Sequence, residues 1–185
     1  MKVVIIHGTF GSPEENWFPW LKKQLEAQWH KVWIPKLSTP ENQSPSVRCD
    51  ELQAQVPFVF DSDTVLIWHS LGATYLLHIL DRERKEPIKK AIFVSWFIHE
   101  LWLPKFDILN APFIEKSFDR ERIKKNVHNV IILHGENDPY VPLSEAHYLN
   151  KKLWWTIEII PWWWHLNAEA GYTHFEKLLN YILTP

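Results

Sequence analysis

Short apolar runs alternate along this chain with segments in which apolar residues recur at helical spacing. The first run, residues 2–7, is continuous and rich in β-branched residues, which is typical of a strand buried on both faces of a parallel sheet. Further strands are predicted at residues 31–36, 64–68, 89–95, 127–134 and 156–160. Helical periodicity predicts helices at residues 16–29, 46–56, 72–84, 120–125, 144–152 and 172–183. Strands that alternate with helices predict an α/β fold, a three-layer sandwich around a mostly parallel six-stranded sheet.

No internal repeat or interdomain linker interrupts this pattern, so we expect a single domain over residues 1–185. Two segments lack regular periodicity. Residues 38–45 are rich in Pro, Ser and Asn and are expected to form a loop. Residues 96–117 are irregular and contain prolines, and we expect them to be an insertion that shapes a substrate site.

Polar residues stand directly after three of the predicted strands. Ser70 follows the third strand at a strand-to-helix junction, Asp138 follows the fifth strand and His165 follows the sixth. Ligands of parallel α/β sheets bind beyond the carboxyl ends of the strands, so these side chains are expected to meet there. Ser, Asp and His in this order match the chain order of an α/β-hydrolase triad. The chemistry needs a hydroxyl nucleophile, an imidazole that takes and returns a proton, and a carboxylate that fixes the imidazole tautomer.

The negative charge that develops on an attacked carbonyl oxygen needs two backbone N–H donors. The N–H of Leu71, the residue after the predicted nucleophile, is one candidate. The other is expected in the turn after the first strand, at Thr9.

Each of these assignments has an alternative. Ser70 could instead be a helix N-cap. Asp138 could cap a turn, with Asp107 as a rival acid. Three other histidines compete with His165 for the role of base: His134, His147 and His174. The position of His165 after the last predicted strand favours it.

Four short motifs resemble one known family. They are His7-Gly8-Thr9, Trp68-His69-Ser70-Leu71-Gly72, the stretch 135–142, and His165-Leu166-Asn167. Through them, and over essentially its whole length, the chain resembles the small serine hydrolases grouped with retinoblastoma-binding protein 9 and the YdeN-like bacterial proteins. The resemblance implies a minimal α/β-hydrolase fold without the usual first antiparallel hairpin, and it implies ester hydrolysis. It assigns Ser70, Asp138 and His165 as the triad, with Thr9 and Leu71 as backbone oxyanion donors.

Composition narrows the classes of partner. The 185 residues carry 20 Lys and Arg against 22 Asp and Glu, with a formal net charge of −2, so no nucleic-acid partner is expected. No stretch approaches the roughly 18 apolar residues of a membrane span. Cys49 is the single cysteine and the N-terminus does not resemble a secretion signal, which favours a cytoplasmic location. No residue spacing resembles a metal site. We therefore expect no metal, no cofactor and a small-molecule ester as substrate.

Tryptophan and glycine depart from ordinary usage. The chain has 12 Trp and 5 Gly, whereas a usual frequency of about 7% predicts about 13 glycines. Nine tryptophans stand at positions where glycine is expected: Trp29, Trp68, Trp96, Trp102, Trp154, Trp155, Trp162, Trp163 and Trp164. The other three fit helix or strand faces: Trp17, Trp20 and Trp33. Our hypothesis is that the nine replace glycines of an ancestral hydrolase, through engineering or an error in the recorded sequence. The intact mass of the protein tests the second origin.

Two functions from different classes follow. The first is a serine hydrolase that cleaves small or medium acyl esters through an acyl-enzyme. The second is a non-catalytic protein of the same fold that binds a protein or a small ligand through an aromatic surface. The resembled family places a small residue, usually glycine, two positions before and two after the serine. Gly72 meets this pattern and Trp68 does not, so we expect Trp68 to push Ser70 out of its attack geometry. Trp68 and the run Trp162-Trp163-Trp164 favour the second function.

Overall fold

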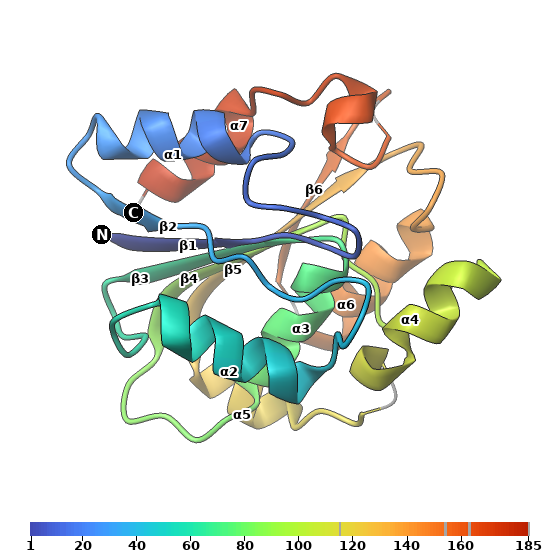
Figure 1. Cartoon of the computed structure of the whole chain (residues 1–185), viewed down its shortest axis with the longest axis horizontal. Helices are drawn as coiled ribbons and strands as arrows, with labels where there is room; N and C mark the ends of the chain where they lie inside the picture. Colours follow the sequence, from blue (N-terminus) through green and yellow to red (C-terminus); the bar gives the residue numbers. More distant parts are fainter. Residues whose placement is uncertain (115, 154, 163, 185) are drawn as a thin grey trace.

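A single parallel sheet forms the centre of the molecule (Figure 1). The computed structural model describes residues 1–114, 116–153, 155–162 and 164–184, so Trp154 and Trp163 lie outside the described residues. The six strands run in the order β2-β1-β3-β4-β5-β6, and every neighbouring pair is parallel. Their bounds are β1 (Lys2–Ile6), β2 (Lys31–Trp33), β3 (Thr64–His69), β4 (Ile88–Val94), β5 (Val127–Gly135) and β6 (Thr156–Ile160). The predicted α/β sandwich with six strands is confirmed.

Helices cover both faces of the sheet (Figure 1). One face carries α1 (Phe18–Glu26) and α7 (Glu176–Leu183). The opposite face carries α2 (Pro45–Gln55), α3 (Leu71–Leu80), α5 (Arg120–Lys125) and α6 (Leu143–Leu153). Among the helices of the described residues, none combines the length and the apolar character needed to cross a membrane.

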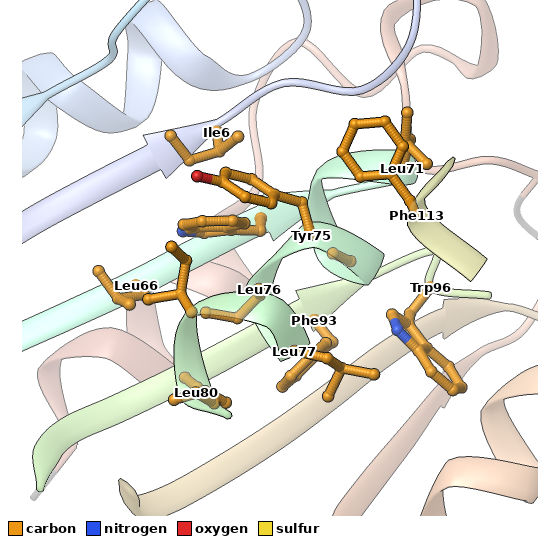
Figure 2. Packing of buried hydrophobic residues seen from close by; sticks show 14 of the residues in the cluster. Ile6, Leu66, Leu71, Tyr75, Leu76, Leu77, Leu80, Phe93, Trp96 and Phe113 are labelled. Atoms are coloured by element: carbon orange, nitrogen blue, oxygen red, sulfur yellow. The ribbon is translucent and has the colours of Figure 1, made fainter. Parts of the chain in front are cut away.

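Alternate side chains of the strands pack into two separate cores. Val3 and Ile5 of β1 belong to the core beneath α1 and α7, whereas Val4 and Ile6 belong to the core on the α3 face. All four are fully buried. Figure 2 shows the second core, in which side chains of α3 gather with those of β3 and β4. Burial on both faces explains why the strands are continuous apolar runs in the sequence.

The prediction that segment 96–117 is irregular is wrong in part, because it contains α4 (Pro104–Ile114). Asp107 stabilises the start of this helix: its two carboxylate oxygens accept hydrogen bonds from the N–H groups of Leu101 and Leu103, each at 2.8 Å. The apolar residues of α4 form no single stripe and Pro112 stands inside it, so the usual helix signals are missing. A short 3₁₀ turn, η1 (Ala168–Ala170), is a further unpredicted element.

Three of the tryptophans at glycine-like positions adopt left-handed backbone conformations. The φ angle is 64° at Trp29, 58° at Trp102 and 65° at Trp162, and their side chains are 95%, 85% and 84% exposed. Positive φ does not occur at Trp68. Backbone geometry that favours glycine therefore underlies the first three positions, and not Trp68.

Two further tryptophans are buried without a partner for the indole N–H. Trp68 and Trp96 are fully buried, and neither Nε1 atom has a hydrogen-bond partner among the described residues. Trp17 is equally buried, but its Nε1 donates to the carbonyl of Leu166 at 3.0 Å. A buried unpaired donor costs about 1–3 kcal/mol, a cost that glycine at residue 68 or 96 would not carry. The glycine hypothesis itself stays a prediction.

Trp29 ends α1 in a Schellman motif. Its N–H donates to the carbonyl of Glu26 at 3.0 Å, and the N–H of His30 donates to the carbonyl of Leu25 at 3.1 Å. These are the two hydrogen bonds of that motif, in which glycine is the usual left-handed residue. Trp29 thus holds a conformation in which its Cβ is unfavourable.

We expect Trp29→Gly to raise the free energy of unfolding by about 1 kcal/mol, because glycine removes the Cβ strain at positive φ. Urea denaturation of both proteins measures the change. Trp29→Ala is the matched control, since it removes the exposed indole but keeps Cβ. An alanine variant as stable as the glycine variant would contradict this account of the helix end.

Candidate functional site

The predicted site residues meet beyond the carboxyl ends of three strands. Ser70 directly follows β3, Asp138 follows β5 and His165 follows β6. Ser70 and His165 both line a cavity of about 370 Å³, together with Thr9 from the turn after β1. The side chain of Asp138 lies behind His165 and is fully buried.

His165 and Asp138 form a hydrogen-bonded pair, with 2.8 Å between His165 Nδ1 and Asp138 Oδ2. The second carboxylate oxygen, Oδ1, accepts hydrogen bonds from the N–H groups of Tyr140 at 2.9 Å and Val141 at 3.0 Å. Burial works to raise the pKa of Asp138, but the hydrogen bond and charge of His165 together with the two N–H donors outweigh it and lower this pKa. The ionised carboxylate therefore holds the proton of His165 on Nδ1, which leaves Nε2 as a base.

Ser70 occupies a strained turn between β3 and α3. Its φ and ψ are 56° and −126°, a conformation that non-glycine residues rarely adopt and that persists only where the surroundings enforce it. The N–H of Ser70 donates to the carbonyl of Val94 at 2.9 Å, and its carbonyl accepts from the N–H of Ala73 at 2.9 Å. No hydrogen bond joins Ser70 to His165 in the described part of the chain. Such bonds between catalytic groups often tighten only when substrate binds.

Two glycines let this turn approach the end of β1. A Cβ placed at Gly72 would lie 2.8 Å from the carbonyl oxygen of His7, and one placed at Gly8 would lie 2.8 Å from Cβ of Ser70. Both distances are shorter than real side chains allow. The start of α3 and the turn after β1 are thus in direct backbone contact.

The two predicted oxyanion donors lie on the two sides of this contact. Leu71 is the first residue of α3 and Thr9 follows Gly8 in the turn after β1. Neither backbone N–H donates a hydrogen bond to any described residue, so both remain available to a ligand. The helix N-terminus adds a favourable dipole for negative charge at this place.

The main chain of His165 is held by side chains that were not predicted as site residues. His69 Nε2 donates to the carbonyl of His165 at 2.9 Å, and Ser95 Oγ donates to the same oxygen at 3.1 Å. Trp17 Nε1 donates to the next carbonyl, that of Leu166. The sequence offered one signal for this role, because His69 and Ser95 also stand at strand ends.

Two neutral histidines lie beneath the site. Burial is the main cause that lowers the pKa of His69 to about 3, with the neighbouring charge of His165 acting in the same direction. Burial likewise lowers the pKa of His7 to about 4, assisted by the charge of Arg48. Both imidazoles are therefore uncharged near neutral pH and act as hydrogen-bonding groups.

The rival residues have other roles. Asp107 stabilises the start of α4, as described above. His134 is buried and donates from Nε2 to the carbonyl of Val141 at 3.0 Å, so it supports the segment that carries Asp138. His174 packs edge-on against Trp20, and the side chain of His147 in α6 is exposed.

Aromatic side chains form much of the cavity wall. Phe10 packs edge-on against Phe106 of α4, with ring centres 5.9 Å apart, and Tyr140 packs edge-on against His165 at 5.2 Å. Phe97 lines the cavity from the segment before α4. Segment 96–117 therefore contributes to the cavity, as predicted, although part of it is helical.

Two carboxylates are among the residues that line the cavity. Glu15 and Glu169 line the cavity, and neither forms an ion pair within the described ranges. Burial raises the pKa of Glu15 above its ordinary value. The OH of Tyr140 donates to Glu169 at 3.4 Å. Within the described ranges, no group of three or more His, Cys, Asp and Glu side chains is placed to hold a metal ion.

Trp68 lies away from the cavity. Its indole packs beside the ring of Tyr75 in α3, with ring centres 4.8 Å apart, inside the core on that face. Ser70 nevertheless lines the cavity in its strained turn. The two side chains thus lie in different places, and the displacement of Ser70 from its attack geometry by Trp68 stays a prediction.

The neutral histidines predict a loss of stability in mild acid. A histidine in the unfolded chain has a pKa near 6.5 and binds a proton below that pH. In the folded protein the pKa is about 4 for His7 and about 3 for His69, so both stay neutral until the pH is much lower. We expect the free energy of unfolding to fall between pH 6.5 and 4 by up to about 1.4 kcal/mol per pH unit for each histidine. Urea denaturation across this range measures the slope.

The variant His69→Gln, which keeps a donor for the carbonyl of His165, should reduce that slope. His128→Asn, at an exposed position near the start of β5, is the matched control and should leave the slope unchanged. An unfolding free energy that does not depend on pH over this range would contradict the assignment of neutral buried histidines.

Comparisons with known proteins agree with this geometry. The family profile described as Serine hydrolase matches residues 3–183. The chain is 27% identical over 173 residues to YdeN of Bacillus subtilis (strain 168), which covers 93% of this chain and 89% of YdeN. The crystal structure of the ydeN gene product from B. subtilis has a TM-score of 0.89 at 26% identity, covering 98% of this chain and 96% of that one.

The same fold extends to more distant proteins. Est1E from Butyrivibrio proteoclasticus has a TM-score of 0.71 at 17% identity, covering 98% of this chain and 86% of that one. The predicted α/β-hydrolase fold and the resemblance to YdeN-like proteins are thereby confirmed. Because the family profile spans nearly the whole chain, this protein is a hydrolase that belongs to the serine hydrolase family.

Proposed function

We propose that this hydrolase cleaves carboxylic esters and uses Ser70, His165 and Asp138 as its catalytic triad. The observation that best supports the proposal is the 2.8 Å hydrogen bond between His165 Nδ1 and Asp138, formed at the cavity that Ser70 also lines. It leaves His165 Nε2 free to accept a proton on the cavity side. Membership of the serine hydrolase family agrees with a serine nucleophile.

In the first half of the proposed reaction, Ser70 Oγ attacks the ester carbonyl carbon while its proton passes to His165 Nε2. The carbonyl oxygen becomes negatively charged and accepts hydrogen bonds from the N–H groups of Thr9 and Leu71. The C–O bond to the alcohol then breaks, and the alcohol leaves with the proton from His165. Asp138 stays ionised and stabilises the transient imidazolium.

In the second half, water hydrolyses the acyl group on Ser70. His165 Nε2 takes a proton from the water, whose oxygen attacks the acyl carbon, and the same donors hold the charged oxygen. The bond to Ser70 Oγ breaks, and His165 returns the proton to it. A carboxylic acid is released and the enzyme is restored.

The size and lining of the cavity favour small or medium acyl esters. A volume of about 370 Å³ lies near the lower end of small-molecule sites. Phe97 and Phe106 offer apolar contact for an acyl chain or an aromatic alcohol. The alternative function, binding without catalysis through an aromatic surface, rests on Trp68 and on exposed tryptophans such as Trp162 and Trp164. We favour the esterase because Ser70 and His165 line one cavity and His165 is hydrogen-bonded to Asp138.

We expect Ser70→Ala to abolish covalent labelling by a fluorophosphonate probe and to lower the hydrolysis of p-nitrophenyl butyrate by at least about 1,000-fold. Gel fluorescence and initial rates measure the two effects. Ser62→Ala is the matched control, because Ser62 lies on the surface and its hydroxyl contacts Glu86. Labelling that survives in Ser70→Ala would reject the assigned nucleophile, and a folded wild type without labelling or hydrolysis would reject the esterase proposal.

The two carboxylates that line the cavity predict a preference by substrate charge. We expect esters that carry a carboxylate to be poorer substrates than neutral esters of equal size, because Glu15 and Glu169 repel them. Glu169→Gln should raise kcat/KM for the anionic ester by roughly two- to fivefold and change the neutral ester little. Glu121→Gln, which changes net charge equally but lies in α5, is the control. An equal gain in both variants would show that net charge, and not the carboxylate in the cavity lining, governs the preference.

A further inference from the structure

Arg48 of α2 is a fully buried cation behind the turn that follows β1. It forms no ion pair with a carboxylate in the described part of the chain. Burial is the main cause that lowers the pKa of Arg48 to about 10, so it stays charged near neutral pH. A buried charge without a counter-ion is costly unless other groups solvate it. The acceptors that surround Arg48 therefore indicate its role.

The guanidinium of Arg48 donates only to oxygen atoms of uncharged groups. Nη1 lies 3.5 Å from the carbonyl oxygen of His7, and Nη2 lies 3.4 Å from that of Gly8. Nη2 also donates to Gln43 Oε1 at 3.3 Å, and Nε donates to the carbonyl of Ser38 at 3.3 Å. Two of the four acceptors thus belong to the turn that carries the proposed oxyanion donor.

The carbonyl of Gly8 is fixed by three donors. Besides Arg48, it accepts from His7 Nδ1 at 3.0 Å and from the N–H of Gly11 at 3.4 Å. The N–H of Leu37 donates to His7 Nε2 at 3.1 Å, which requires the remaining proton of neutral His7 to sit on Nδ1 and to point at Gly8. The orientation of this carbonyl is therefore determined by His7, which directly follows β1, by Arg48 of α2 and by the N–H of Gly11.

The orientation of the carbonyl also determines that of the next N–H. The peptide between Gly8 and Thr9 is trans, so its C=O and the N–H of Thr9 point in opposite directions. With the carbonyl held toward buried Arg48, the N–H is turned to the other side of the peptide. Gly8 itself packs directly against Ser70, so this peptide lies beside the nucleophile.

We propose that Arg48 is a positioning residue of the oxyanion site, which together with His7 holds the Gly8–Thr9 peptide so that the N–H of Thr9 faces the substrate oxygen. This inference rests on the proposed function. The positive charge at the carbonyl end polarises the peptide and makes its N–H a stronger donor. The same charge favours the negative oxygen that develops in the transition state.

The network around Arg48 also reaches the cavity wall. Gln43, which accepts from Arg48, donates from Nε2 to the carbonyl of Leu109 in α4 at 2.7 Å. Thr9 Oγ1 donates to Oδ1 of Asn110, the next residue of α4, at 3.0 Å. The peptide with the proposed donor is therefore held from the arginine side and from the cavity wall, as preorganised electrostatic stabilisation requires.

The variant Arg48→Met tests the inference in the full-length protein. We expect kcat for p-nitrophenyl butyrate to fall roughly ten- to hundredfold, with KM changed by less than about threefold, because transition-state contacts are lost more than ground-state contacts. An alkylboronic acid, whose adduct with Ser70 places an oxygen at the oxyanion position, should bind more weakly by a similar factor.

The matched control is Lys90→Met. Lys90 is also buried, and its Nζ donates to the carbonyls of Tyr181 and Thr184, away from the cavity. This variant should lose stability without a comparable loss of kcat. Arg48→Lys keeps the charge and should recover part of kcat, and it also serves if Arg48→Met does not fold.

The outcomes separate the two proposals. If the wild type is active and Arg48→Met and Arg48→Lys keep the kcat and the boronic acid affinity of Lys90→Met, the role of Arg48 is overturned. The proposed function then still stands. A fall in kcat that is matched by Lys90→Met would also overturn the role of Arg48, because the effect would then be general destabilisation. A wild type that is neither labelled nor active would overturn the proposed function, and with it this inference.

Discussion

The contact between the turn after β1 and the start of α3 is the constraint on which the site depends. No Cβ fits at Gly8 or Gly72, where it would lie 2.8 Å from Ser70 Cβ or from the carbonyl oxygen of His7. Because bare backbone is present on both sides, the two turns touch, and Thr9 and Leu71 lie on the two sides of the contact. Wider spacing would separate Ser70 from one of the two oxyanion donors that we propose.

Buried side chains that donate to main-chain carbonyls hold the rest of the site in place. His69 and Ser95 fix the carbonyl of His165, and Arg48 fixes that of Gly8. In each case a side chain from one strand or helix holds the main chain of another segment, so a functional loop is positioned by the sheet and its helices. The left-handed backbone of Ser70 persists for the same reason, since its N–H is bonded to β4.

The sequence was informative where burial or chain order decides structure. The strands were predictable because burial on both faces leaves continuous apolar runs, and Ser70, Asp138 and His165 stand out because each follows a strand. The helix α4 was not predictable, because its apolar residues form no stripe and Asp107, within its first turn, accepts hydrogen bonds from N–H groups of the segment before it. Arg48 gave no signal either, since an arginine in a helix usually faces solvent and its acceptors are distant in the sequence.

A side chain at a position that favours glycine has one of two effects: it strains the backbone, or it collides with neighbouring atoms. This difference explains how a chain with few glycines can have this site. At Trp29 or Trp162 a side chain only strains a left-handed turn and projects into solvent, which costs about 1–2 kcal/mol. At Gly8 or Gly72 any side chain would collide with the backbone or with Ser70. Tryptophan is tolerated where it affects stability alone, and no described tryptophan lines the cavity. A chain with so few glycines can therefore have the site of a serine hydrolase, because its five glycines include the two at this contact.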